Sequence, residues 1–240
     1  MKNKRKTWFK GYKGFIKLFK KPTNFQYVGS KIDSPSIILS NHVGTSAPLS
    51  FELYLKNVPI RFWGAYEMNS SFKNMYRYQT KVFYHEKRGW NIQLARLYCL
   101  LATPLTYIFY KGLNLISTYK DGRLVKTIKE SYDSIKEGNS IIVFPEISDK
   151  GYLDNLEGFH KGFVIMLDYA YRKGLDLPVV VTYYHKKSNV HMIDEKINYS
   201  ELLLKFNTYE EIANYLCDRC NKLGEICQKS YLDKINSLNK

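Results

Sequence analysis

SIILSNH (residues 36–42) and SIIVFPE (residues 140–146) are the two stretches that decide the fold. Each begins with a short apolar run rich in isoleucine and valine, which is typical of a strand buried on both faces of a parallel sheet. Each run then ends at once in polar or proline-containing sequence. Between them, LVKTIKESYDSIKE (residues 124–137) has the apolar periodicity of an amphipathic helix, and Gly138 is its stop signal.

Further strands and helices are expected around these two stretches. Apolar, β-branched or aromatic runs predict strands at residues 58–65, 115–118, 178–184 and 190–193. Amphipathic patterns predict helices at residues 48–56, 70–80, 163–171 and 208–230, the last opening with Thr208 and Glu211 in capping-box spacing. Because strands alternate with helices, the sequence predicts an α/β fold with a mixed, largely parallel sheet covered by helices on both faces.

Length and composition indicate one globular domain after a short N-terminal segment. The chain has 240 residues, of which 45% are apolar and 25% charged. A domain of this size holds its core without disulfides or metal ions. The cysteines and histidines show no metal-ligand spacing, so we expect no metal site and no bound cofactor, and we expect the cysteines to be buried small residues.

The charge of the chain indicates an anionic partner. Lysine and arginine number 37 against 22 acidic residues, which gives a net charge of +15. Nine of the basic residues, and no acid, lie in residues 1–21. A membrane surface, a nucleic acid or a phosphorylated substrate would each fit this excess of positive charge.

Residues 1–22 are predicted to form a basic amphipathic helix at a membrane interface, ahead of a single domain at residues 23–240. With Thr7 as N-cap, Trp8, Tyr12, Phe15 and Phe19 share one face and lysines share the other. This pattern favours docking to anionic lipid. The alternative is a helix that packs its aromatic face on the domain, and a nucleic-acid partner is the least favoured interpretation.

No signal peptide and no membrane span are expected from the sequence. The basic N-terminal segment is not followed by an uninterrupted apolar region. The most apolar run, residues 97–110, contains Pro104 and is about 14 residues long, whereas a span needs roughly 20. We therefore expect a peripheral protein on the cytoplasmic face of a membrane.

Candidate catalytic groups follow the two deciding strands. His42 and Glu146 each come where the chain leaves the carboxyl end of a buried strand, the usual place for functional residues in an open α/β sheet. A histidine and a carboxylate brought together can carry acid and base chemistry near neutral pH. Lys120, Arg123 and Lys161, on predicted loops around these strand ends, could hold a phosphate monoester.

Four motifs in order give the chain a resemblance to a known family. The four motifs are SIILSNHVGTSAPLSFELYL, ISTYKDGR, SIIVFPEIS with LEGFHKGFVIMLDYA, and LPVVVTYY. Over about residues 25–200 the chain resembles the glycerolipid acyltransferases typified by bacterial 1-acylglycerol-3-phosphate acyltransferase. The resemblance implies transfer of a fatty acyl group from acyl-CoA or acyl-carrier protein to the hydroxyl of a lysophospholipid.

The resemblance also implies roles for particular residues. Asn41 and His42 match the first motif, in which the histidine is the general base; the aspartate expected to orient it is replaced by Ala47. Glu146 would contact the glycerol part of the acceptor. Lys120 occupies the place of a phosphate-gripping arginine, Arg123 follows it, and Lys161 matches a lysine that opens a helix; these three and Asn41 are the remaining substrate-binding candidates.

Ala47 leaves alternatives open. Glu52, Glu67, Glu86 or the hydroxyl of Ser46 could replace the missing carboxylate. If none does so, the chain would be a catalytically impaired relative that retains lipid binding. The sequence thus favours an active acyltransferase, then a lipid-binding relative, and last a basic nucleic-acid-binding protein.

Overall fold

The computed structural model describes residues 7–29, 31–56, 58–119, 121–147 and 153–238. Seven strands form one sheet in the order β1-β7-β6-β2-β5-β3-β4. All neighbouring pairs are parallel except β6 and β7, which confirms the predicted mixed, largely parallel sheet. The strands are β1 (Asn24–Tyr27), β2 (Ile37–Ser40), β3 (Ile60–Ala65), β4 (Ile116–Thr118), β5 (Ser140–Val143), β6 (Pro178–His185) and β7 (Val190–Asn198).

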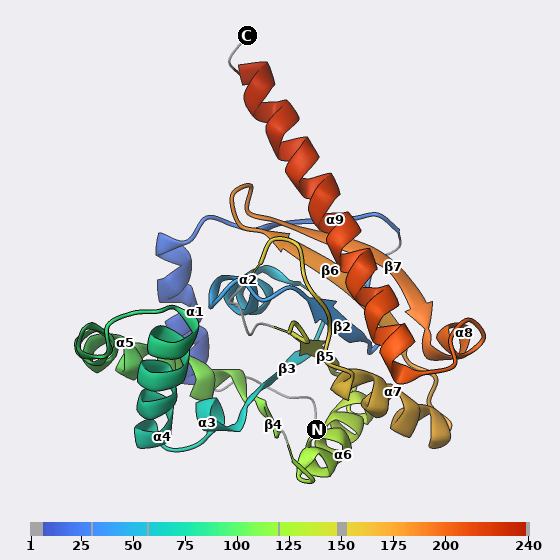
Figure 1. Cartoon of the computed structure of the whole chain (residues 1–240), viewed down its shortest axis with the longest axis horizontal. Coiled ribbons are helices and arrows are strands. Elements are labelled where there is room, and N and C mark those ends of the chain that lie inside the picture. The colour runs from blue at the N-terminus through green and yellow to red at the C-terminus, as the bar shows by residue number, and fades with distance from the viewer. Residues whose placement is uncertain (1–6, 30, 57, 120, 148–152, 239–240) are drawn as a thin grey trace.

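Helices cover both faces of the sheet (Figure 1). The helical elements are α1 (Thr7–Phe19), α2 (Ser46–Tyr54), α3 (Tyr66–Asn69), α4 (Phe72–Arg77), the π-helix η1 (Tyr78–Lys87), α5 (Ile92–Leu113), α6 (Leu124–Lys136), α7 (Gly162–Arg172), α8 (Tyr199–Leu203) and α9 (Tyr209–Leu238).

The central strand β2 contributes to two hydrophobic cores, one on each face of the sheet. Ile37 and Leu39 point into a core shared with α6, α7 and α9, whereas Ile38 points into a second core shared with α1, α2 and α5. Every side chain of β2 is buried, because successive residues alternate between two covered faces. This is why the strand reads as a continuous apolar run rather than an alternating one.

Several predicted elements are confirmed, with small shifts at their ends. The predicted strand at 190–193 is β7, which pairs with β6 and extends to Asn198. At the start of α9 the Thr208 side chain accepts from the Glu211 N–H at 3.2 Å and Glu211 accepts from the Thr208 N–H at 3.0 Å, as a capping box requires. The four cysteines are free and buried, as expected.

Other elements differ from the sequence prediction. The helix expected at residues 70–80 is instead split into α4 and the π-helix η1, preceded by α3. Strand β1, at the sheet edge, was not predicted, because its four residues NFQY form no distinct apolar run.

The apolar run at residues 97–110 lies in a longer helix than the sequence predicts. The run at residues 97–110 belongs to α5, which continues at both ends through polar residues and is 22 residues long. Within the described residues, α5 is long and apolar enough to cross a membrane by length and composition, and 22% of its most apolar window is buried. The sequence estimate was too short because Arg96 and Lys111 interrupt the apolar run without ending the helix.

The buried residue Phe9 anchors helix α1 on α5. Phe9 is fully buried, and its ring centroid lies 6.0 Å from that of Phe109. Gly112 of α5 makes room for it, because a Cβ atom there would lie 1.9 Å from the Phe9 ring. Trp8, Phe15 and Phe19 remain exposed. The aromatic face of α1 is therefore shared between the domain and the surface.

We predict that Gly112→Ala and Gly14→Ala have opposite effects on stability. Alanine normally favours a helix over glycine by about 1 kcal/mol, so Gly14→Ala, with nothing within 4 Å of the added methyl group, should stabilise the protein slightly. Gly112→Ala should lower the free energy of unfolding by about 1–3 kcal/mol because the methyl group overlaps Phe9. Urea denaturation of both variants checks this, and equal stabilisation by both would contradict the packing of α1 on α5.

Candidate functional site

The parallel pairing of β2 with β5 brings His42 and Glu146 together. One carboxylate oxygen of Glu146 accepts the backbone N–H of His42 at 2.9 Å. The other accepts the N–H of Leu153 at 3.3 Å. Glu146 thus fixes the start of the loop that carries the His42 ring, and it is 6% exposed.

Burial controls the titration of both groups. Desolvation raises the pKa of Glu146, an effect opposed by the hydrogen bonds from the His42 and Leu153 N–H groups. Burial, and then the positive charge of Lys87, lower the pKa of His42 from 6.5 to about 4. The His42 ring is therefore neutral at pH 7 and has a nitrogen lone pair that can accept a proton.

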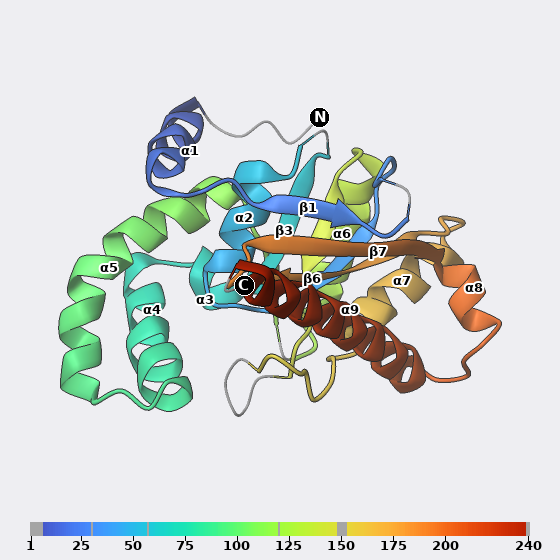
Figure 2. The same cartoon turned by 90° about the horizontal axis from the view of Figure 1, so that it is seen from above.

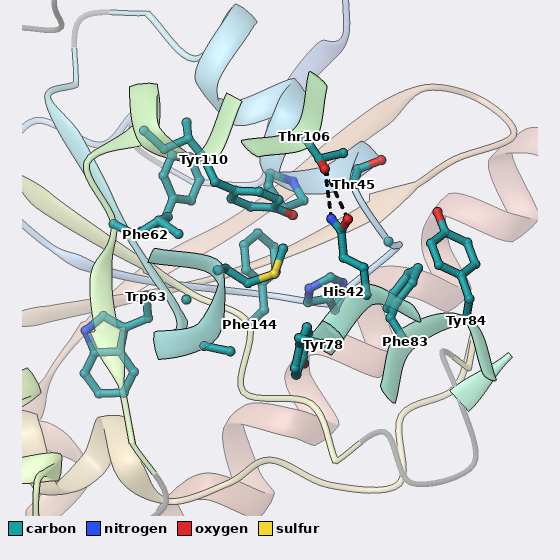
Figure 3. Close-up of a pocket in the computed structure, with 18 residues that line it drawn as sticks. His42, Thr45, Phe62, Trp63, Tyr78, Phe83, Tyr84, Thr106, Tyr110 and Phe144 are labelled. Carbon is teal, nitrogen blue, oxygen red and sulfur yellow. Dashed lines mark hydrogen bonds between the residues drawn. The ribbon is translucent and has the colours of Figure 1, made fainter. Parts of the chain in front are cut away.

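His42 lies in the wall of an apolar cavity of about 130 Å³ (Figure 3). Its ring contacts Phe144 edge to face at a centroid distance of 5.0 Å. Its wall is formed mainly by the loop after β2, by β3, by η1 and by the inner face of α5. Its lining includes Gly44, Thr45, Pro48, Phe62, Trp63, Met68, Tyr78, Phe83, Tyr84, Tyr110, Leu113 and Leu115.

Two polar side chains of the cavity wall, Gln79 and Thr106, bond to each other. Gln79 of η1 donates to the Thr106 hydroxyl of α5 at 2.9 Å, a bond that Figure 3 marks with a dashed line at Thr106. Its carbonyl oxygen accepts from Thr103 at 2.8 Å. These bonds tie η1 to α5 and leave a largely apolar space beside His42, which can hold a short stretch of a hydrocarbon chain.

Ala47 is fully buried in the first turn of α2, and its methyl group can accept no hydrogen bond from an imidazole. Among the proposed replacements, Glu52 is committed elsewhere, because its carboxylate accepts from the Lys13 ammonium at 2.7 Å. That ion pair links α2 to α1. The structure thus gives Glu52 a structural role between two helices.

Asn41 has a structural role as well. Its side-chain oxygen accepts the Tyr184 N–H at 2.7 Å, and its amide group donates to the Tyr184 carbonyl at 3.2 Å. These two bonds extend the pairing of β2 with β6 by one residue. Asn41 therefore fixes the position from which His42 leaves the sheet.

Of the three predicted phosphate-binding cations, the two that the structure describes, Arg123 and Lys161, do not line the cavity. Lys120 lies outside the described residues. Arg123 forms a two-pronged contact with the carboxylate of Asp121 and lies over the Tyr119 ring at 4.5 Å. Lys161 forms an ion pair with Glu210 of α9. Arg123 and Lys161 are thus already paired with carboxylates.

Sequence reasoning missed two cations at the end of η1. The positive charge of Lys87 lowers the pKa of both His42 and Glu146, which favours the neutral imidazole and the ionised carboxylate. The Arg88 guanidinium lies over the ring of the cavity-lining residue Phe83 at 5.0 Å, and one of its nitrogens is 3.6 Å from where a Cβ atom at Gly44 would be. The adjacent pair of basic residues was the signal in the sequence, but no motif connects it to His42.

No metal centre is evident in the part of the chain that the structure describes. No group of three or more His, Cys, Asp or Glu side chains in those residues is arranged to hold a metal ion.

Comparisons with known proteins include a distant structural likeness. No protein-family model matches the chain, and no curated protein matches it. Among solved structures, the crystal structure of the 1-acyl-sn-glycerophosphate (LPA) acyltransferase PlsC from Thermotoga maritima is 15% identical, with a TM-score of 0.49, over 90% of this chain and 75% of that one. A likeness this distant establishes neither a family nor an activity.

We predict that the buried His42 ring makes stability depend on pH. Because the pKa of His42 is lower in the folded chain than the unfolded value of 6.5, its contribution is complete above pH 6.5 and is lost as the pH falls toward 4. Wild type should lose about 2 kcal/mol more stability than His42→Asn between pH 7 and pH 4.5. Urea unfolding at both pH values measures this, and parallel losses in the two proteins would contradict the low pKa.

Proposed function

We propose that the protein is an acyltransferase that moves a fatty acyl group from an acyl-thioester, either acyl-CoA or acyl-carrier protein, to the hydroxyl of a lysophospholipid such as 1-acylglycerol-3-phosphate. The observation that carries the proposal is the neutral His42 in the wall of an apolar cavity, with its backbone held by Glu146. The order of the four sequence motifs supports the same activity.

The proposed chemistry needs one base and no bound cofactor. His42 takes the proton from the acceptor hydroxyl while that oxygen attacks the thioester carbonyl. The tetrahedral intermediate then expels the thiolate, which receives the proton, so that the products are an ester and a free thiol. The apolar cavity would hold the acyl chain and keep water away from the thioester.

The second candidate is a catalytically impaired relative that retains lipid binding, and Ala47 is the observation that favours it. In a His-Asp pair of another enzyme class, loss of the carboxylate's acceptor function lowers turnover about 10⁴-fold. The aspartate position here offers a buried methyl group. A third candidate, a nucleic-acid binder, rests on net charge alone.

The central test is an assay of the purified chain with acyl-CoA and acyl-carrier-protein donors against a panel of lysolipids. We expect ester formation, and we expect His42→Ala to lower kcat at least 100-fold while the protein stays folded. Ala47→Asp should raise kcat, because a carboxylate can orient the ring. No turnover by either the wild type or Ala47→Asp, with lipid binding intact, would favour the impaired relative.

The acceptor phosphate is proposed to meet several cations. Lys120, Arg123 and Lys161 come from the sequence motifs, and we add Lys87 and Arg88 because they lie beside His42 and the cavity. An arginine fork suits a phosphate monoester.

Arg88→Gln and Arg123→Gln separate these candidates. Both arginines are exposed and lie over aromatic rings, but Arg123 is already bonded to Asp121. Arg88→Gln should raise KM for a phosphate-bearing acceptor about tenfold and leave KM for a monoacylglycerol unchanged. Arg123→Gln should have the smaller effect. A larger effect of Arg123→Gln, or an equal effect of Arg88→Gln on both acceptors, would show that Arg88 does not bind the phosphate.

The proposed place of action is the cytoplasmic face of an anionic membrane, as a peripheral protein. The basic segment at residues 1–22 supports this, since lysines on α1 can contact lipid headgroups while its exposed aromatic residues enter the interface.

A further inference from the structure

The net positive charge of the chain comes from two segments. Residues 72–113 contain seven basic residues and one acid, and residues 1–21 contain nine basic residues and no acid. These two segments account for the whole net charge of +15. The other 177 residues contain 21 basic and 21 acidic residues and are neutral overall. The second segment runs from α4 through η1 to the end of α5.

The two positive segments meet in the folded chain. Phe9 of α1 packs against Phe109 of α5, and the Tyr12 hydroxyl donates to the Leu105 carbonyl at 3.2 Å. Figure 2 shows α1, α4 and α5 together at one side of the molecule, beyond the end of the sheet. Six of the seven basic residues of segment 72–113 are exposed. The described basic residues of the two segments, five on or just after α1 and seven from α4 to α5, are therefore carried by elements at the same side of the molecule.

An apolar stripe runs through this region. On α5, five exposed residues recur every three or four positions, so they lie along one side of the helix. We call them the outer stripe: Leu94, Leu97, Leu101, Leu105 and Ile108, which are 62%, 63%, 77%, 60% and 41% exposed. Phe15, Leu18 and Phe19 of α1 are 60%, 79% and 72% exposed. Apolar surface gathered in this way marks an interaction site.

The opposite side of α5 belongs to the domain. Ala95, Cys99 and Thr103 are fully buried there, and Thr106 and Tyr110 line the cavity beside His42. A helix held along one side in this way can lie in the plane of a membrane interface, with its free side among lipid chains. Its length alone would also allow it to cross a membrane, but its inner side already packs on protein.

We propose that α1 and segment 72–113 form one docking surface for an anionic phospholipid bilayer, with the outer stripe of α5 inserted among the acyl chains. Basic residues around the stripe then contact the lipid headgroups. Charge favours this partner over a second copy of the chain, since a symmetric dimer would bring two strongly positive surfaces together. In this arrangement the cavity receives its acyl chain from the bilayer side of α5. Only this last point rests on the proposed function.

The test is binding of the full chain to vesicles, which needs no catalysis. Wild type should sediment with vesicles of phosphatidylglycerol and phosphatidylcholine, and much less with phosphatidylcholine alone. The variant Leu97→Gln/Leu101→Gln/Leu105→Gln should bind the anionic vesicles at least tenfold more weakly. These three side chains are exposed, so the variant should keep the wild-type fold by circular dichroism.

A matched control replaces three exposed apolar residues by glutamine at α8 and α9, away from α5. Leu204, Ile226 and Leu232 are 87%, 50% and 46% exposed, on or next to α8 and on α9. Their triple replacement by glutamine should leave vesicle binding unchanged. Equal binding by the α5 variant and wild type, equal loss in both variants, or no binding by wild type would overturn the proposal. So would light scattering that shows a stable dimer which the α5 variant dissociates.

Vesicle binding and catalysis can fail separately. A chain that binds vesicles through the outer stripe but acylates no lysolipid would keep this docking surface and lose the proposed enzyme activity. A chain that acylates dispersed lysolipids but does not bind vesicles would keep the proposed enzyme activity and lose the docking surface.

Discussion

The bond from the His42 N–H to the Glu146 carboxylate is the interaction on which the candidate site depends. It joins the ends of two neighbouring parallel strands, β2 and β5, whose side chains are buried on both faces of the sheet. A buried carboxylate that accepts two backbone N–H groups holds their loops in one position, and its removal leaves both part-buried N–H groups without this acceptor. The His42 ring can then face the cavity rather than solvent.

The contact of Glu146 with the acceptor stays a prediction, and the structure adds a structural role for this carboxylate. The motif resemblance implied a contact between Glu146 and the acceptor, whereas in the structure both of its oxygens accept backbone N–H groups. A sequence pattern can place a carboxylate at a strand end, but it cannot tell whether the carboxylate faces a substrate or the backbone. The same holds for Asn41, whose side chain is bonded to Tyr184 of β6.

Much of the fold could be predicted because its signals are local. The buried runs of β2 and β5, the amphipathic pattern of α6 and the capping box at Thr208 each depend on residues within one element. The π-helix η1 and the full length of α5 could not be predicted. Helix α5 is apolar on two sides and so shows no single amphipathic face. The position of Arg88 depends on η1, and therefore escaped prediction with it.

Helix α5 connects the positively charged docking surface with the cavity beside His42. Its inner side closes the cavity beside His42, and its outer side carries the exposed stripe within the positive surface. The helix thus separates the place where an acyl chain would react from the place where lipid would lie. Burial of His42, which keeps its ring neutral, depends on the same packing of η1 and α5 over the loop after β2.

The measurement that tests this account most directly is a crystal structure of the chain with a non-hydrolysable thioether analogue of acyl-CoA. The account predicts that the acyl chain lies in the cavity between β3, η1 and α5, with the carbon that replaces the thioester carbonyl next to the His42 ring. An acyl chain bound in the groove along α9, lined by His185 and Asn221, would contradict it.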